Sequence, residues 1–233
     1  MCRVLILLGL GFLLVVPAHG QDRKLLKSKG WGSLSGKVIH GRTGRPIANA
    51  LVFLKAPGGT YFPIHNNDRV RKKPLVIDVT KAAFTPRLSA HFPSYFDGKK
   101  MASTGEKITF RNDSKFAINL RATPHPILNE DNSFNLILSA KTSATKTFNA
   151  QPMPVVLQDD LAPAKKKGLV QVFDHPYFGI TDKNGSFNIP RVPANADIAV
   201  IGWHEDFGWI PQKAGTRLKF KAGKNALDLI WPR

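Results

Sequence analysis

Short runs in which apolar and polar residues alternate recur along the chain, at 33–39, 107–111 and 217–221. Because successive side chains of a strand point to opposite faces, this alternation predicts strands with one buried and one solvated face. Two other runs, 50–54 and 198–201, are apolar throughout. Continuous apolar runs of this length predict strands that are covered on both faces.

Clusters of glycine, proline, asparagine and aspartate separate these runs, at 44–46, 57–59, 112–113, 183–185 and 222–225. Such clusters are typical of turns. Beyond residue 20, no stretch of ten or more residues has the apolar spacing of a helix. Many short strands punctuated by turns predict an all-β protein, built as a sandwich or a barrel.

Two segments that lie far apart in the sequence resemble one known family when they are joined. They carry the patterns G-x-V from Gly36, G-x-P-I-x-N-A-x-V from Gly44, and T-D-x-x-G-x-F-x-I-x-x-V-P from Thr181. Together they resemble the carboxypeptidase regulatory-like family of transthyretin-type β-sandwiches. The resemblance implies a discontinuous carbohydrate-binding-like unit formed by residues 31–62 plus 175–233.

The sequence between these halves, residues 75–174, resembles exported bacterial proteins with a cupredoxin-like (plastocyanin-like) unit. The resemblance is carried by residues 105–113, 118–123, 134–135 and 170–178, with 203–205 beyond them. It implies two Greek-key β-sandwich units, the cupredoxin-like one inserted in the transthyretin-like one or merged with it.

The resemblance also implies where copper ligands would stand: at Ile118, Asp160, Pro163 and Lys166. A blue-copper site needs two imidazoles, a thiolate and a weak axial ligand, and none of these residues supplies the set. We therefore expect no metal, no cofactor and no electron transfer. A copper-binding electron-transfer protein is the alternative.

Residues 1–20 have the layout of a secretory signal, with Arg3, an apolar run from Val4 to Val16 and small residues before position 21. The run is 13 residues long, shorter than the roughly 20 that cross a bilayer. We expect no transmembrane anchor after cleavage and a periplasmic or secreted protein. Cys2, the single cysteine, would leave with the signal, which excludes disulfides and thiol nucleophiles from the mature chain.

The chain carries a formal charge of +18. Two tight basic clusters are candidate contacts for a polyanion: Arg69, Arg71, Lys72 and Lys73, and Lys165, Lys166 and Lys167. Neither cluster is interleaved with aromatic residues as in a single-strand binding groove, so nucleic acid is not the expected partner. Outside the cytoplasm, the anionic partners that such clusters could contact are cell-envelope polymers and acidic glycans.

Catalytic patterns are missing from the sequence. It has no G-x-S-x-G nucleophile elbow and no glycine-rich phosphate loop. Its histidines lack metal-ligand spacing, although an unrelated histidine and carboxylate site stays open, as does a pair of catalytic carboxylates. We expect the protein not to be an enzyme.

A binding module is the function that we expect, with a glycan or a protein as the partner. Aromatic rings stack on sugar rings while their polar edges hydrogen-bond. The candidate ligand-binding residues are Trp209, Tyr61, Trp31 and His204. The alternative is a structural or accessory protein of the cell envelope that holds polyanions on its basic surface.

Overall fold

The computed structural model describes residues 24–80, 83–127, 130–162, 167–210 and 215–231. The predicted signal peptide, residues 1–20, lies outside these ranges. The described residues form strands and two short 3₁₀ helices, and none of them lies in an α-helix. Within the same ranges, no helical segment has the length and apolarity needed to cross a membrane. The protein is all-β, as the sequence predicts.

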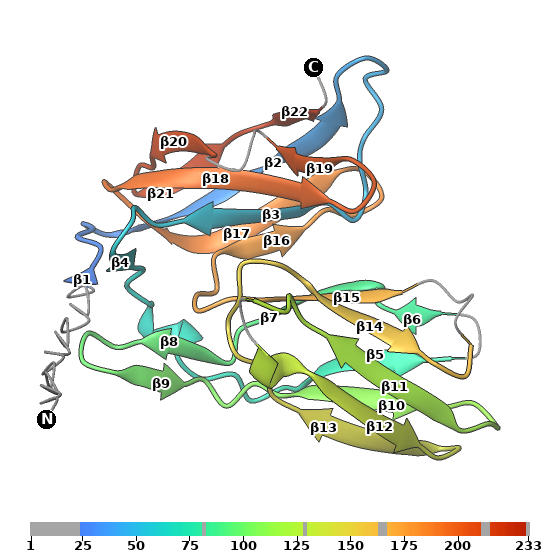
Figure 1. The fold of residues 1–233 in the computed structure, drawn as a ribbon. Coiled ribbons are helices and arrows are strands. Elements are labelled where there is room, and N and C mark those ends of the chain that lie inside the picture. Colours follow the sequence, from blue (N-terminus) through green and yellow to red (C-terminus); the bar gives the residue numbers. More distant parts are fainter. Residues whose placement is uncertain (1–23, 81–82, 128–129, 163–166, 211–214, 232–233) are drawn as a thin grey trace, which may run out of the picture.

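Strands from the two ends of the chain form the upper part of Figure 1, here called the terminal body. Its first sheet has the order β16-β3-β18-β19, and β20 also pairs with β18. The bounds are Phe178–Ile180 for β16, Leu51–Lys55 for β3, Asp197–His204 for β18, Gly208–Ile210 for β19 and Thr216–Lys219 for β20. Its second sheet has the order β17-β2-β21, and β22 also pairs with β2. Here the bounds are Ser186–Pro193 for β17, Trp31–His40 for β2, Gly223–Ala226 for β21 and Leu229–Trp231 for β22.

Strands from the middle of the chain form the lower part of Figure 1, the central body. One sheet has the order β12-β11-β14-β15-β7. Its bounds are Phe134–Leu138 for β12, Ile118–Thr123 for β11, Val155–Asp159 for β14, Gly168–Val172 for β15 and Leu88–His91 for β7. The other sheet has the order β13-β10-β5-β6. Its bounds are Thr142–Lys146 for β13, Ile108–Asn112 for β10, Leu75–Val79 for β5 and Phe84–Thr85 for β6.

The remaining elements are short and lie at the side of the two bodies. Strands β1 (Lys24–Leu25) and β4 (Thr60–Tyr61) form a parallel pair, and β8 (Ser94–Phe96) and β9 (Met101–Ser103) an antiparallel pair. The 3₁₀ helices are η1 (Asn66–Asp68) and η2 (Glu130–Asn132). That each body is a Greek-key unit of a known family stays a prediction.

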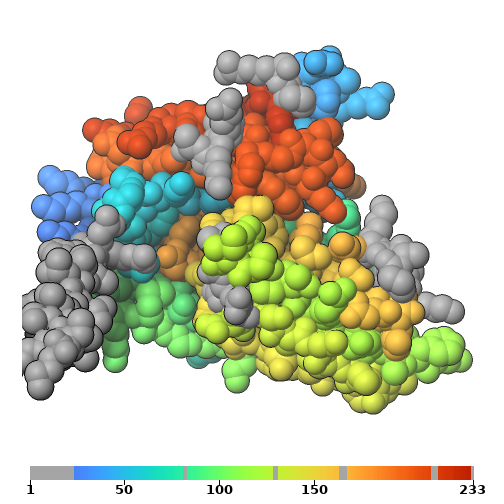
Figure 2. Space-filling view, in the orientation of Figure 1, coloured from blue at the N-terminus to red at the C-terminus, as the bar shows by residue number. Residues whose placement is uncertain are grey.

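Three apolar clusters hold the four large sheets together. One fills the terminal body and one fills the central body. A third, with Leu51 from β3, Leu88 from β7 and Leu169 from β15, joins the two bodies. Figure 2 shows the bodies packed directly against each other along this contact.

Strand β3 explains why one predicted strand is apolar throughout. Val52 and Leu54 point into the core of the terminal body, whereas Leu51 and Phe53 point into the cluster between the bodies. Both faces are therefore covered, as the run at 50–54 predicts. The predicted strands at 33–39, 107–111 and 198–201 are confirmed in β2, β10 and β18, and most of 217–221 lies in β20.

A glycine closes the turn before β17, where the sequence predicts one. The Asp182 carboxylate accepts hydrogen bonds from the backbone N–H groups of Asn184 (2.8 Å) and Ser186 (2.9 Å). Gly185 follows with a φ of +71°, and a Cβ there would lie 2.6 Å from the carbonyl oxygen of Val38. No other residue fits both this conformation and this close approach.

Candidate functional site

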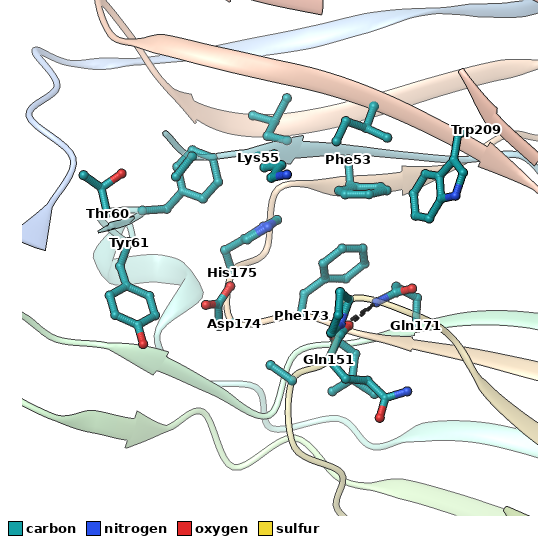
Figure 3. A pocket seen from close by; sticks show the side chains of 17 residues that line it. Phe53, Lys55, Thr60, Tyr61, Gln151, Gln171, Phe173, Asp174, His175 and Trp209 are labelled. Carbon is teal, nitrogen blue, oxygen red and sulfur yellow. Dashed lines mark hydrogen bonds between the residues drawn. The ribbon is translucent and has the colours of Figure 1, made fainter. Parts of the chain in front are cut away.

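A cavity of about 360 Å³ opens where the two bodies meet. Strand β3 of the terminal body forms one side, and the connection that leaves β15 of the central body forms the other (Figure 3). Its volume falls within the range of small-molecule sites, roughly 300–1,000 Å³. It is the candidate functional site.

Three aromatic rings line the cavity, two from the terminal body and one from the connection after β15. Phe53 lies at the centre, with its ring centroid 5.1 Å from that of Phe173 and 6.2 Å from that of Trp209. Trp209 is half-buried on β19, the edge strand of its sheet. Its indole lines the cavity while part of the side chain stays accessible to solvent.

His175 closes the inner end of the cavity and is 6% exposed. It packs edge-on against Phe62, with ring centroids 4.8 Å apart, and parallel to Tyr177 at 5.7 Å. Its Nδ1 accepts a hydrogen bond from the backbone N–H of Tyr177 (3.1 Å), which leaves the proton of the neutral ring on Nε2.

The pKa of His175 is lowered to about 4. Burial is the main cause, because the imidazolium would lose its hydration in this apolar setting, and the nearby Asp174 offsets only part of that loss. At neutral pH the ring is therefore an uncharged part of the wall. It contributes an uncharged aromatic surface to the wall, not a cation.

Buried amides form the side of the cavity that belongs to the central body. Gln171 donates from Nε2 to the carbonyl oxygen of Gln151 (2.6 Å), the dashed line in Figure 3. The Gln151 side chain accepts from Nδ2 of Asn132 (2.8 Å) and donates to the carbonyl oxygen of Met153 (2.5 Å). Because each buried amide is fixed by a neighbour, this side is rigid and polar.

The mouth of the cavity carries side chains of both charges. Lys55 is exposed at the end of β3, and Asp174 is half-buried beside His175. Tyr61 lies on the far side with Thr60, and its ring stacks on Phe96 with centroids 4.6 Å apart (Figure 3). One cation and one anion leave the mouth without net formal charge, so charge alone does not select its ligand.

The four candidate ligand-binding residues do not come together. Trp209 and Tyr61 both line the cavity. Trp31 instead packs on the core of the terminal body, edge-on to His65 at 5.2 Å. His204 lies at the end of β18, where its ring is 5.0 Å from that of Phe207.

The described residues of the two basic clusters lie near opposite ends of β7. Arg71 donates its backbone N–H to the carbonyl oxygen of Thr104 (2.8 Å), and the Thr104 hydroxyl is bonded to Phe92, just after the strand. The Lys167 carbonyl oxygen accepts from Nε of Arg87, just before the strand (3.2 Å). Arg69, Lys72 and Lys73 are exposed, as is Lys167, whereas Lys165 and Lys166 lie outside the described residues.

Ile118 and Asp160, the two described positions that the resemblance aligns with copper ligands, point in different directions. Ile118 is 2% exposed in the core of the central body. Asp160 pairs with Nε of Arg121 (2.9 Å), which lies on the opposite face of β11 from Ile118. Pro163 and Lys166 lie outside the described residues. In the ranges that the structure covers, no three histidine, cysteine, aspartate or glutamate side chains are grouped closely enough to hold a metal ion.

A scan against protein-family models and a search of curated proteins found no match to this sequence. The site is therefore interpreted from its own geometry. Four residues of the site could not be predicted from the sequence. Phe53 and Phe173 look like ordinary core residues there, and Gln151 and Gln171 look like ordinary surface amides. The sequence does single out Trp209 and Tyr61 among the lining residues, and His175 lies in the segment 170–178 that carries the cupredoxin resemblance.

Proposed function

We propose that the protein is a non-catalytic binding module that recognises a carbohydrate in the cavity between its two bodies. The aromatic rings of Phe53, Phe173 and Trp209, together with hydrogen-bonding side chains at the mouth of the same cavity, carry this proposal. Sugar rings have apolar C–H faces and a hydroxyl edge, so they fit a site with aromatic faces on one side and hydrogen-bonding groups on the other.

The neutral character of the mouth favours an uncharged sugar over a polyanion at this cavity. Lys55 and Asp174 offset each other in formal charge, and His175 is neutral at physiological pH. Hydrogen bonds to a ligand would come from the side chains of Lys55, Thr60 and Asp174 at the mouth. A glycan whose end enters the cavity is therefore our first candidate, and a protein partner is the second outcome of the test.

An exported location completes the proposal. It is supported by the signal-like residues 1–20, with Arg3 before an apolar run and small residues at its end. The two-body architecture, with one body from the chain ends and one from the middle, is compatible with a cupredoxin-like unit inserted in a transthyretin-like unit. On this proposal the cavity between the units is a recognition surface.

Binding of the purified protein to neutral oligosaccharides tests the proposal. Cellohexaose, xylohexaose and chitohexaose are titrated while the tryptophan fluorescence is followed. Trp209→Ala is expected to weaken binding of the preferred sugar about tenfold, the size of one lost stacking contact of about 1.4 kcal/mol. Phe116→Ala is the matched control, because Phe116 is an aromatic residue 61% exposed in the turn before β11.

Two results would contradict the proposal. One is a protein that binds none of the three oligosaccharides. The other is a Trp209→Ala variant that binds as tightly as the unmodified chain, which would place any sugar site elsewhere. If the unmodified chain captures a protein partner and the Trp209→Ala variant does not, the ligand of the cavity is that protein and not a glycan.

A further inference from the structure

A second cavity, of about 370 Å³, lies beyond the same connection that closes the first. Along the segment 173–178, Asp174 and His175 line the first cavity, whereas Pro176 and Phe178 line the second. The other lining residues are polar or charged, apart from Pro190. They are Asn67, Asp68, Arg71 and Arg191.

Arg191 is held in place by an irregular strand and a buried partner. The pairing of β17 with β2 shifts register between Ile189 and Val192, and Arg191 has a φ of +54° within this bulge. Bulges re-aim side chains, and a non-glycine residue adopts such a backbone only where its surroundings fix it. The guanidinium then binds Asp68 through Nε (2.7 Å) and one Nη (2.5 Å).

This ion pair fixes Arg191 without using all of its donors. The Asp68 side chain is only 8% exposed, whereas that of Arg191 is 39% exposed. A guanidinium has five N–H donors, and the pair with Asp68 needs two of them. The remaining edge of Arg191 is therefore oriented before any ligand arrives.

Arg71 reaches the cavity from the other side and is held more loosely. Its guanidinium carbon lies 5.5 Å from the centre of the Phe92 ring, and its Nη1 is 3.8 Å from Oε1 of Glu106. The other carboxylate oxygen of Glu106 already accepts from the backbone N–H of Phe92 (2.6 Å) and contacts Nδ1 of His91 (2.9 Å). At 3.8 Å the contact with Arg71 exceeds hydrogen-bond length, so the N–H groups of Arg71 can turn to a ligand.

The charge of this cavity differs from that of the first. Its lining carries two guanidinium groups against one carboxylate. Arg69, Lys72 and Lys73 stand exposed on the same stretch of chain and add to the positive potential. Pro176, Pro190 and Phe178 supply apolar surface beside the arginines, and a less polar surrounding strengthens the attraction of a guanidinium for an anion.

We propose that this second cavity binds an oxyanion, the carboxylate, sulfate or phosphate group of an acidic ligand, between Arg71 and Arg191. The planar forks of two arginines match the paired oxygens of such groups. Asn67 adds a neutral donor at the rim. This site is independent of the carbohydrate cavity and does not require that proposal to hold.

Calorimetric titration of the purified protein in low salt tests the site with three probes. They are inorganic phosphate, a sulfated heparin hexasaccharide and a galacturonic acid hexasaccharide, which separate a free ion from a sulfated and from a carboxylated glycan. Arg71→Gln is expected to weaken the best of the three about tenfold, because it removes charge-assisted hydrogen bonds at the site. Lys72→Gln is the matched control: it removes the same charge from the adjacent residue, which does not line the cavity.

The comparison of the two variants decides the outcome. Loss of affinity in Arg71→Gln with less than a twofold change in Lys72→Gln supports the site, and the tightest probe identifies its ligand class. Equal losses in both variants would show diffuse attraction to a basic surface and overturn the proposal, as would the failure of all three probes. Arg71→Lys, which keeps the charge but loses the fork, is expected to bind with intermediate affinity, and its thermal unfolding temperature shows whether the fold is intact.

Discussion

Two cavities of similar volume lie on either side of one short connection, and their chemistry is opposite. The first, about 360 Å³, is walled by Phe53, Phe173 and Trp209 and has no net formal charge. The second, about 370 Å³, has two arginines and one carboxylate in its lining. The difference shows that the volume of a cavity in this fold does not determine which ligand it can bind. Each cavity takes its character from the elements that meet the connection 173–178: Phe53 and Trp209 at the first cavity, and Asp68, Arg71 and Arg191 at the second.

Removing the side chain that joins the two cavities has the largest effect that we predict. Phe173 is 6% exposed, lines the first cavity and stacks at 4.8 Å on Phe178, which lines the second. Phe173→Ala should lower the free energy of unfolding by about 4 kcal/mol, because it deletes a buried ring and leaves a hole between the bodies. Urea denaturation measures the change.

Phe116→Ala serves as the control for this loss. Phe116 is 61% exposed, and its truncation should change the unfolding free energy by less than about 0.5 kcal/mol. If Phe173→Ala costs no more than this control, the connection is not the packed wall that separates the cavities, and the comparison between them fails.

The strands could be predicted from sequence because their signal is local. The sequences of β2 and β10 alternate every second residue. The runs 51–54 in β3 and 198–201 in β18 are apolar because both faces of these strands are covered. Turn residues are equally local, as Gly185 shows with its φ of +71°. No knowledge of the neighbouring sheets is needed to find such elements.

The cavities could not be predicted in the same way, because they collect residues that are distant in sequence. Phe53 and Trp209 come from one sheet, and they meet Phe173 only where that sheet packs on the connection after β15. The aromatic candidates therefore separate in the structure: Trp209 lines the cavity, whereas Trp31 packs on a core. No pattern in the sequence distinguishes these two tryptophans.

The charged cavity could not be predicted from the sequence for the same reason. In sequence, Arg71 is one cation among several neighbours. In the structure it lines the same cavity as Arg191, a residue 120 positions later that is oriented by a bulge and by Asp68. A bulge depends on how two strands pair, so its position is not visible in the alternation of a single strand.

Acidification should lower the stability of the fold through His175, which belongs to the first cavity only. The expected effect is of intermediate size. The ordinary pKa of histidine, 6.5, applies to His175 in the unfolded chain, whereas its folded pKa is about 4. Between these values the unfolded state binds a proton that the folded state does not, so stability falls as the pH is lowered from 7 towards 4. Between pH 7.5 and pH 5 we expect a loss of about 2 kcal/mol from this group, measured by urea denaturation at each pH.

Two variants assign this pH dependence to the buried ring. His175→Asn keeps an acceptor for the N–H of Tyr177 but cannot take up a proton, so its stability should fall about 2 kcal/mol less over the same pH range. His125→Asn is the control, since His125 accepts from the backbone N–H of Ile127 in a similar local contact (3.4 Å) but is only half-buried. If both variants retain the full slope, His175 is not the neutral wall of the first cavity.

The salt dependence of ligand binding is the smallest effect that we predict, and it compares the two cavities most directly. Raising NaCl from 0.05 M to 0.5 M shortens the Debye length from roughly 14 Å to about 4 Å, which screens attraction between guanidinium groups and an oxyanion. We expect the acidic probe to bind the second cavity about tenfold more weakly at the higher salt, and the neutral oligosaccharide to bind the first with less than a twofold change.

The same titrations in Arg71→Gln should show a shallower salt dependence for the acidic probe and none for the neutral one. A neutral sugar whose affinity falls in parallel with that of the acidic probe would mean that both occupy one basic surface, and the distinction between the two cavities would then have no functional meaning.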